Sequence, residues 1–470
     1  MNMPWSPTSW RTRPFPVAQK VDYPDRPALD GVLTALAKLP PLVTSWEVES
    51  LKKQLALACR GEAFLLQGGD CSETFEDCQS EALVSKLKIL LKMSVILVYG
   101  CQQRVIRVGR FAGQYAKPRS CQTETHDGVT LPSYRGNLIN RKPFTPADRT
   151  PDSSLLLRGY ERAALTLNFL RSLVAGGFAD HHHPELWDVD FVSHSSRSGD
   201  YHQIMDAIVQ AVSFMEAVAG RTLAELDGVE FFVSHEGLHL DYEQAQTRQV
   251  PRRTGWYDLT THFPWIGDRT RLLDGAHVEF FRGIANPIGV KLGPSCSPDE
   301  LLSLTEILNP QNEPGRLTLI HRFGAAAIDI CLPPLIEAVR RAGRVVLWCC
   351  DPMHGNTLTT KSGLKTRRFE DIRQELDRAF EIHESQGTHL GGAHFELTGE
   401  NVTECTGGAR GLTEADLSKS FLSDVDPRLN YEQAMEMALL IARRMSRSRR
   451  LVPPAIHALA DTCGARVSPV

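Results

Sequence analysis

The sequence predicts an α/β fold, a TIM (β/α)8 barrel with an N-terminal extension and inserted helices. Eight short apolar runs have the length of buried strands. Helical stretches separate most of them, and such alternation is typical of parallel βαβ units. A charged or metal-capable residue follows each run, as expected where the carboxyl ends of barrel strands meet at one mouth. The runs are Phe64–Gly69, Val105–Val108, Phe231–Ser234, Phe263–Gly267, Ile288–Val290, Leu317–Ile320, Val345–Trp348 and His394–Phe395.

Stretches with helical patterning fill the intervals between these runs. We expect residues 51–470 to form the catalytic barrel, with a helical insertion at about 150–230. Residues 1–50 are rich in proline and contain three tryptophans, so we expect an extension that packs on the barrel or on a partner. The predicted helices are Glu81–Val98, Arg158–Val174, Tyr201–Leu223, Pro298–Leu308, Pro333–Arg341, Phe369–Ser385 and Tyr431–Met445.

The composition is ordinary for a soluble globular enzyme. The 470 residues are 42% hydrophobic and 23% charged, and the net charge of −4 does not favour binding to nucleic acid or to an anionic membrane. The longest apolar stretch, Ile89–Tyr99, is too short to span a bilayer. The odd number of cysteines (11) and a start without the apolar core of a signal peptide predict a reducing, cytoplasmic location.

Four residues have the chemistry of a divalent-metal site: Cys71, His354, Glu396 and Asp426. Each lies in a turn marked by glycine or proline. Their mixed sulfur, nitrogen and oxygen donors suit Mn²⁺, Fe²⁺, Co²⁺ or Zn²⁺ better than Mg²⁺. Because the four are far apart in the sequence, their spacing leaves open the alternative that they are unrelated turn residues.

A second set consists of cations. Arginine binds phosphate or carboxylate with two parallel hydrogen bonds, and lysine supplies a point charge. Since these cations follow apolar runs, we expect a binding site for an anionic, phosphorylated substrate, although a set of surface salt bridges is the alternative. The set is Arg110, Lys117, Arg269, Lys291 and Arg322.

Two histidine-containing strings point to a metal but are better explained otherwise. The run His181–His183 beside a proline is typical of a solvated loop. The string His235–His239 matches the zinc-protease pattern H-E-x-x-H, which works only on a helix. Here it follows the predicted strand Phe231–Ser234, and Gly237 disfavours a helix, so we reject a protease.

Longer strings of this chain strongly resemble class II 3-deoxy-D-arabino-heptulosonate 7-phosphate (DAHP) synthase, a transferase. The similarity runs from about Trp10 to Arg443, and Ser9–Arg11 and Tyr23–Asp25 are similar to the plant-type branch. The strings are Phe64–Cys71, Gly113–Ser120, Asp274–His277, Ala285–Pro287, Cys350–Thr357 and His394–Cys405.

The resemblance implies a TIM-barrel enzyme that condenses phosphoenolpyruvate with erythrose 4-phosphate, the first step of the shikimate pathway towards chorismate and the aromatic amino acids. It implies a divalent metal, for which we expect Mn²⁺, with Co²⁺, Fe²⁺ or Zn²⁺ as alternatives. The implied metal ligands are Cys71, His354, Glu396 and Asp426. The implied phosphoenolpyruvate contacts are Arg110, Arg269, Lys291 and Arg322, with Lys117 nearby and Lys365 close to the aldose phosphate.

We expect Lys291, Asp268 and Arg269 to be the catalytic residues. Lys291 and a metal-bound water are both candidates for moving protons. The family commonly has Glu where Asp268 stands, and this shorter carboxylate is expected to orient water or an arginine. The family often has Cys where Val425 stands, so a disulfide from that position to Cys71 is excluded here.

Alternatives to an active synthase remain at this stage. One is a degenerate homologue that senses an aromatic amino acid or docks a partner such as chorismate mutase, and another is a different metal-dependent aldolase. We also expect a homo-oligomer that assembles through residues 1–50 and is inhibited by an aromatic amino acid.

Overall fold

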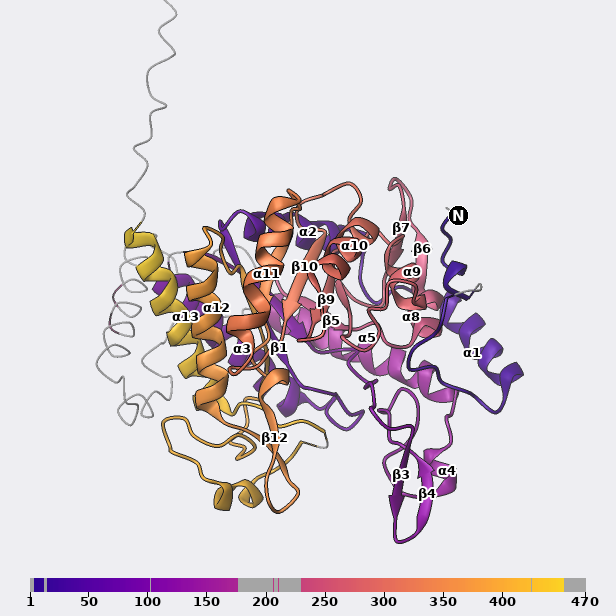
Figure 1. Ribbon diagram of the computed structural model, residues 1–470. Coiled ribbons are helices and arrows are strands. Elements are labelled where there is room, and N and C mark those ends of the chain that lie inside the picture. The colour runs from indigo at the N-terminus through magenta and orange to yellow at the C-terminus, as the bar shows by residue number, and fades with distance from the viewer. Residues whose placement is uncertain are drawn as a thin grey trace, which may run out of the picture.

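Eight parallel strands form a closed barrel. The computed structural model describes residues 4–11, 15–101, 103–175, 230–423 and 425–451, together with Asp206 and Gln210. All eight predicted barrel strands are present, and around the barrel their order is β1-β14-β11-β10-β9-β8-β5-β2, which confirms the predicted fold (Figure 1). The strands are β1 (Ala63–Gly69), β2 (Arg104–Arg110), β5 (Phe232–Glu236), β8 (Phe263–Ile266), β9 (Ile288–Leu292), β10 (Leu317–His321), β11 (Leu347–Cys350) and β14 (Gly392–Glu396).

Helices surround the barrel. Two of them, α10 (Pro298–Leu308) and α12 (Phe369–Ser385), have the predicted bounds, and α3, α5 and α13 extend the predicted ones by a few residues. In Figure 1, α12, α13 and α3 lie side by side on one flank of the barrel. The predicted helix Tyr201–Leu223 and the run His181–His183 lie outside the described residues. Further helices are α3 (Ser80–Cys101), α5 (Ser154–Ala175), α8 (Leu240–Gln246), α9 (Ala276–Phe281), α11 (Ile328–Arg341) and α13 (Tyr431–Leu451).

Two predicted boundaries are wrong. The helix expected at Pro333–Arg341 begins at Ile328, so two prolines lie inside it. The carbonyls left without donors belong to an exposed first part of the helix, where solvent can replace the lost bonds. The strand expected at Val345–Trp348 lies at Leu347–Cys350, because the cysteine thiols pack as small apolar groups and continue the ladder with β10.

The amino end of the barrel is filled by apolar side chains. Alternate residues of each strand point inward, including Leu65, Phe263, Ile320 and Cys349, which form one buried cluster. The helix α2 (Ser45–Cys59) contributes Leu51 and its neighbours to the same cluster, so it covers the amino ends of the strands. A capping box between Thr44 and Glu47 fixes where α2 begins.

The N-terminal segment packs on the barrel's own helices. Its 3-10 turn η1 (Ser9–Arg11) contacts α9, and Trp10 is buried. Trp5 donates its indole N–H to the carbonyl of Glu279 at 2.9 Å. The helix α1 (Arg26–Lys38) lies against α5 and α8 and buries Leu29 and Leu36. Residue 50, where we expect the extension to end, lies inside α2.

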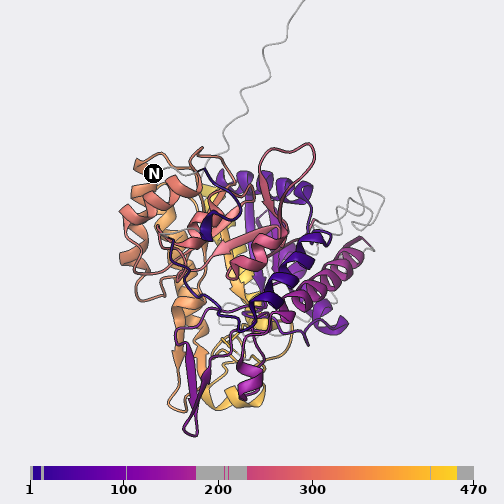
Figure 2. The same ribbon diagram turned by 90° about the vertical axis from the view of Figure 1, so that its right-hand side faces the viewer.

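Two hairpins project from the carboxyl end of the barrel. They are β3–β4 (Thr123–His126 and Val129–Pro132) and β12–β13 (Thr357–Thr359 and Lys365–Arg367). Both extend from the same end of the molecule in the two views of Figures 1 and 2. They frame the opening of the mouth. The described residues also form the hairpin β6–β7 (Thr247–Gln249 and Trp256–Asp258), the short helix α4 (Pro146–Arg149) and the 3-10 turns η4 (His354–Asn356) and η5 (Glu414–Lys419). Across the described ranges, no helix is both long and apolar enough to cross a membrane.

One buried carboxyl on α13 makes stability depend on pH. Burial and the like charges of Glu370 and Glu432 raise the pKa of Glu436 to about 7 from its ordinary value of 4.5, although the Ala409 N–H that it accepts opposes this. The stability that Glu436 provides is therefore fully present below pH 4.5 and lost as the pH rises through about 7.

We expect Glu436→Gln to be more stable than the wild type at pH 8, by up to ~3 kcal/mol, since the amide oxygen can still accept the Ala409 N–H. The difference should vanish near pH 4.5. Denaturant unfolding of both proteins at the two pH values measures it. A difference that does not change with pH would contradict this account.

Candidate metal centre and anion-binding pocket

A pocket of about 530 Å³ opens at the carboxyl ends of the strands. Every predicted site residue except Glu396 lines it, and Glu396 is fully buried in contact with two of the lining residues. The barrel therefore brings together residues that are hundreds of positions apart in the sequence. The predicted residues on its wall are Cys71, Arg110, Lys117, Asp268, Arg269, Lys291, Arg322, His354, Lys365 and Asp426.

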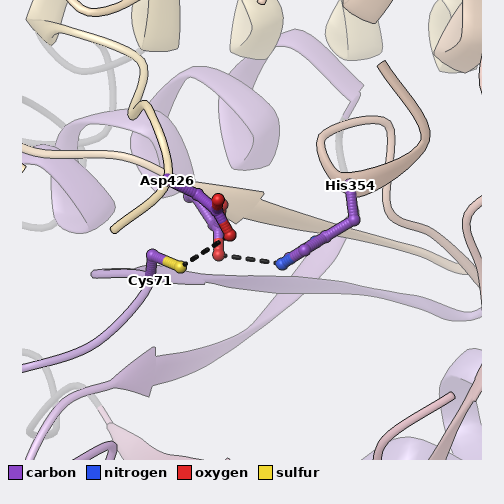
Figure 3. A group of neighbouring side chains, drawn as sticks. Cys71, His354 and Asp426 are labelled. Carbon is purple, nitrogen blue, oxygen red and sulfur yellow. Dashed lines mark hydrogen bonds and ion pairs between the residues drawn. The ribbon is translucent and has the colours of Figure 1, made fainter. Parts of the chain in front are cut away.

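The four predicted metal ligands form one cluster. One donor atom from each of Cys71, His354, Glu396 and Asp426 lies within 4.8 Å of the others. The Cys71 Sγ is 3.5 Å from Asp426 Oδ2, and His354 Nε2 is 2.9 Å from Glu396 Oε1. Figure 3 shows the side chains of Cys71, His354 and Asp426 pointing towards one another. The ladder between β1 and β14 explains this meeting, because Gly69, two residues before Cys71, pairs with Glu396.

The surroundings of His354 fit a metal ligand. Its Nδ1 is 2.7 Å from Asp351 Oδ2, so Nε2 is directed at the other donors. Asp351 also accepts the backbone N–H groups of Met353 and His354, at 3.0 and 3.2 Å. Burial opposes its ionisation, but the charges of His354 and Lys291 hold the pKa of Asp351 well below its usual range. The donor set of one sulfur, one nitrogen and two carboxylates fits Mn²⁺, Fe²⁺, Co²⁺ or Zn²⁺.

Cations neutralise the two carboxylates of the cluster. Lys117 Nζ lies 2.6 Å from Asp426 Oδ2 and 2.7 Å from Cys71 Sγ. Glu396 pairs with Arg110 at 3.3 Å and with the fully buried Arg367 at 2.7 Å. Burial raises the pKa of the Cys71 thiol, as does Glu396, while Lys117 opposes the shift. A thiolate at this position therefore needs a further positive charge beside it.

The cations predicted to bind phosphate differ in their burial. Arg110 and Lys291 are buried, at 3% and 5% exposure, and both lie over the ring of Trp265, so they are not surface salt bridges. Arg322 is partly exposed, whereas Arg269 is exposed at the rim and donates to Ser120 Oγ at 3.0 Å. Burial and the nearby charge of Arg110 lower the pKa of Lys291, against the opposing effect of its partner Asp351.

Asp268 holds Arg322 in place. Its Oδ2 accepts from Arg322 at 3.2 Å, and its Oδ1 accepts from Arg271 at 3.0 Å and from the Gly293 N–H at 2.9 Å. Arg322 also donates to the carbonyl of His354 at 2.9 Å. The carboxylate thus orients an arginine, which is one of the two roles expected for it.

A buried glutamate fixes the loop between Arg110 and Lys117. Glu73 accepts the backbone N–H groups of Ala112, Gly113 and Gln114 at 2.9, 2.9 and 2.8 Å. A Cβ on Gly113 would lie only 2.4 Å from the His235 ring, so the close approach requires glycine. Sequence reasoning missed Glu73, and only the fold reveals its role.

Glu236 is a second residue that sequence reasoning missed. It ends β5, lines the pocket and has no hydrogen-bond partner for Oε1 within the described part of the chain. Burial raises its pKa, which Lys291 and Arg110 oppose. Its position after a predicted strand was the sequence feature that could have identified it as a pocket residue. The rejection of the zinc-protease motif is confirmed, because His235 lies in the strand and His239 caps α8.

Comparisons with known proteins point to one family. The model of the class-II DAHP synthetase family matches residues 5–442. A protein from Neurospora crassa named phospho-2-dehydro-3-deoxyheptonate aldolase is 44% identical over 462 residues, which cover 95% of each chain. A protein of the same name from Streptomyces coelicolor is 49% identical and covers 94% of this chain and 98% of its own. A solved structure of that name from Francisella tularensis aligns over 91% of this chain and 97% of its own, with a TM-score of 0.46 and 16% identity.

We expect Cys71→Ser and His354→Ala each to weaken Mn²⁺ binding at least roughly tenfold, since each removes a donor of the cluster. Isothermal titration with Mn²⁺ measures the affinity. Cys331→Ser, on α11 and away from the cluster, is the matched control and should bind as the wild type does. Unchanged affinity in both ligand variants would show that the metal binds elsewhere.

Proposed function

The chain belongs to the class-II DAHP synthetase family, and we propose that it condenses phosphoenolpyruvate with D-erythrose 4-phosphate, releasing phosphate, as the first step of the shikimate pathway. One observation carries the proposal: a cluster of four possible metal donors and a set of cations meet at one pocket. The complete residue set gives no support to a degenerate, purely sensory homologue.

The cations of the pocket suit phosphoenolpyruvate, which carries a phosphate and a carboxylate. We assign its binding to Arg110, Arg269, Lys291 and Arg322, with Lys117 nearby. Lys365, half-exposed on the β12–β13 hairpin and 3.0 Å from Asp426 Oδ1, is placed to meet the phosphate of the aldose. Fixed cations neutralise both substrates and hold the enol carbon against the aldehyde carbon.

In the reaction the enol carbon attacks the aldehyde, water adds to the resulting cationic carbon, and phosphate leaves. A bound divalent cation supplies Lewis acidity to the aldehyde oxygen. We assign proton transfer to Lys291, whose lowered pKa makes it a better donor than an ordinary lysine. Asp268 keeps Arg322 directed into the pocket, and Arg269 closes its rim.

We propose Mn²⁺ as the metal, with Co²⁺, Fe²⁺ or Zn²⁺ as alternatives held by Cys71, His354, Glu396 and Asp426. The mixed donor set supports an ion of this group, and a titration of activity with each metal after chelation distinguishes them. We also propose a cytoplasmic location, in which the free thiol of Cys71 stays reduced.

The substrate assignment predicts a selective effect. We expect Arg322→Ala to raise the KM for phosphoenolpyruvate roughly ten- to hundredfold, because a charged hydrogen bond is worth about 1.5–3 kcal/mol. The KM for erythrose 4-phosphate should change less. Steady-state kinetics with Mn²⁺ measure both constants.

The control for that experiment is Arg340→Ala, which removes an exposed arginine on α11 and should leave both constants unchanged. Equal increases for the two substrates in Arg322→Ala would contradict the assignment. Absence of product from the wild type with both substrates and any of the four metals would contradict the proposed function itself.

We further propose a homo-oligomer that assembles through residues 1–50, with chorismate mutase as a candidate partner. The support within the segment is Trp46, an aromatic side chain that is 71% exposed at the start of α2. Deleting the whole segment is a poor test, because α1 buries Leu29 and Leu36 in the core. A single surface substitution is sharper.

We expect Trp46→Ser to weaken self-association at least roughly tenfold, since a central interface tryptophan is typically worth 2 kcal/mol or more. Light scattering over a concentration series measures the change. Val129→Ser, at an exposed apolar residue of the β3–β4 hairpin, is the control. A monomeric wild type, or equal effects of the two substitutions, would refute this interface.

A further inference from the structure

A second group of possible metal donors lies on the other side of the barrel wall. It consists of His321 at the end of β10, Cys350 at the end of β11 and Glu375 on α12. His321 and Cys350 are register partners in the ladder. Because side chains alternate along a strand and Ile320 and Cys349 belong to the barrel interior, His321 and Cys350 face the helices instead.

The three residues offer donors at close range in a fully buried place. One donor atom from each lies within 4.8 Å of the others, and all three residues are 0% exposed. In the described part of the chain neither ring nitrogen of His321 has a hydrogen-bond partner. A buried imidazole without partners is unfavourable, because it has lost its bonds to water and gained none. A ligand for one nitrogen would remove that cost.

Glu375 retains capacity for one more interaction. Its Oε1 accepts the backbone N–H groups of Phe323 and Gly324 at 2.8 and 2.9 Å, whereas among the described residues Oε2 accepts only from Asn356 Nδ2, at 2.7 Å. A carboxylate offers about four lone pairs, so one remains on Oε2. The three bonds also fix the carboxylate, as ligating carboxylates usually are.

We propose that His321, Cys350 and Glu375 form a structural Zn²⁺ site, separate from the metal cluster of the pocket. Nitrogen, thiolate and carboxylate are the ligands that Zn²⁺ takes, and a site closed to solvent is typical of structural zinc. On binding, the Cys350 thiol loses its proton to the solvent. His383 is the candidate for a fourth ligand, because its ring centroid lies 6.4 Å from that of His321 and its buried Nε2 has no partner among the described residues.

The proposed zinc site would stabilise the pocket from the helix side of the barrel wall. Glu375 binds the loop after β10, which follows Arg322, and the loop after β11, which contains His354. A cation joining Glu375 to the ends of both strands would therefore fix α12, β10 and β11 relative to one another. Its role is in stability and positioning, and it takes no part in the reaction.

Counting metal in the full-length protein tests the proposal independently of activity. The variant Cys71→Ser/His354→Ala lacks two ligands of the pocket cluster. After exposure to Zn²⁺ and dialysis it should retain one equivalent by mass spectrometry of the metal. With Co²⁺ in place of Zn²⁺ it should show a cobalt–thiolate absorption band, and Zn²⁺ should raise its melting temperature.

Two neighbouring cysteines, Cys350 and Cys349, provide a test variant and its matched control. Adding Cys350→Ser to that variant should abolish the band and the retained zinc, whereas adding Cys349→Ser, which faces the barrel interior, should leave both intact. If the protein with Cys350→Ser does not fold, the measurements on Cys71→Ser/His354→Ala alone test the proposed zinc site. The proposal is wrong if Cys71→Ser/His354→Ala fails to retain zinc, or retains zinc but shows no cobalt–thiolate band. It is also wrong if the band survives the addition of Cys350→Ser.

Discussion

The pocket depends on the buried carboxylate of Asp351. One oxygen, Oδ2, pairs with Lys291 from the anion-binding set and with Nδ1 of His354 from the metal cluster. A buried charge is tolerated only when it is paired and hydrogen-bonded. Asp351 therefore keeps Lys291 inside the barrel and at the same time sets the direction of the His354 ring. The proposed anion-binding residues and the metal-donor cluster are therefore both held by the same carboxylate.

Charge pairing also explains why so many ionised groups can be buried around this pocket. Glu396 has no exposed surface, yet it is balanced by Arg110, Arg367 and His354. Arg110 ends β2, Arg367 ends the β12–β13 hairpin and His354 lies in the loop after β11, so the ion pairs join separate parts of the carboxyl end of the barrel. Glu236 is the exception, since one of its oxygens has no hydrogen bond within the described residues. This oxygen of Glu236 can accept a hydrogen bond from a substrate or a water in the pocket.

The sequence was sufficient for the barrel strands and insufficient for the contacts between them. A strand buried on both faces is a continuous apolar run, so all eight were found and only the one ending at Cys350 was displaced. Residue types alone left the four metal donors as possible turn residues, and family resemblance selected them. Barrel closure, which pairs β1 with β14, is what brings Cys71 to Glu396. Glu73 and Arg367 had no local signal, because their roles consist of contacts with distant loops.

Asp268 can reach two partners because the backbone next to it carries no side chain. Gly293 lets the carboxylate approach closely, since a Cβ on that residue would lie 2.5 Å from Asp268 Oδ2. Asp268 thereby reaches the Gly293 N–H and Arg322 together. Arg322 in turn donates to the His354 carbonyl. The anion-binding set and the metal cluster are thus joined twice, through Asp351 on the buried side and through Asp268 and Arg322 on the open side, which makes the geometry of each dependent on the other.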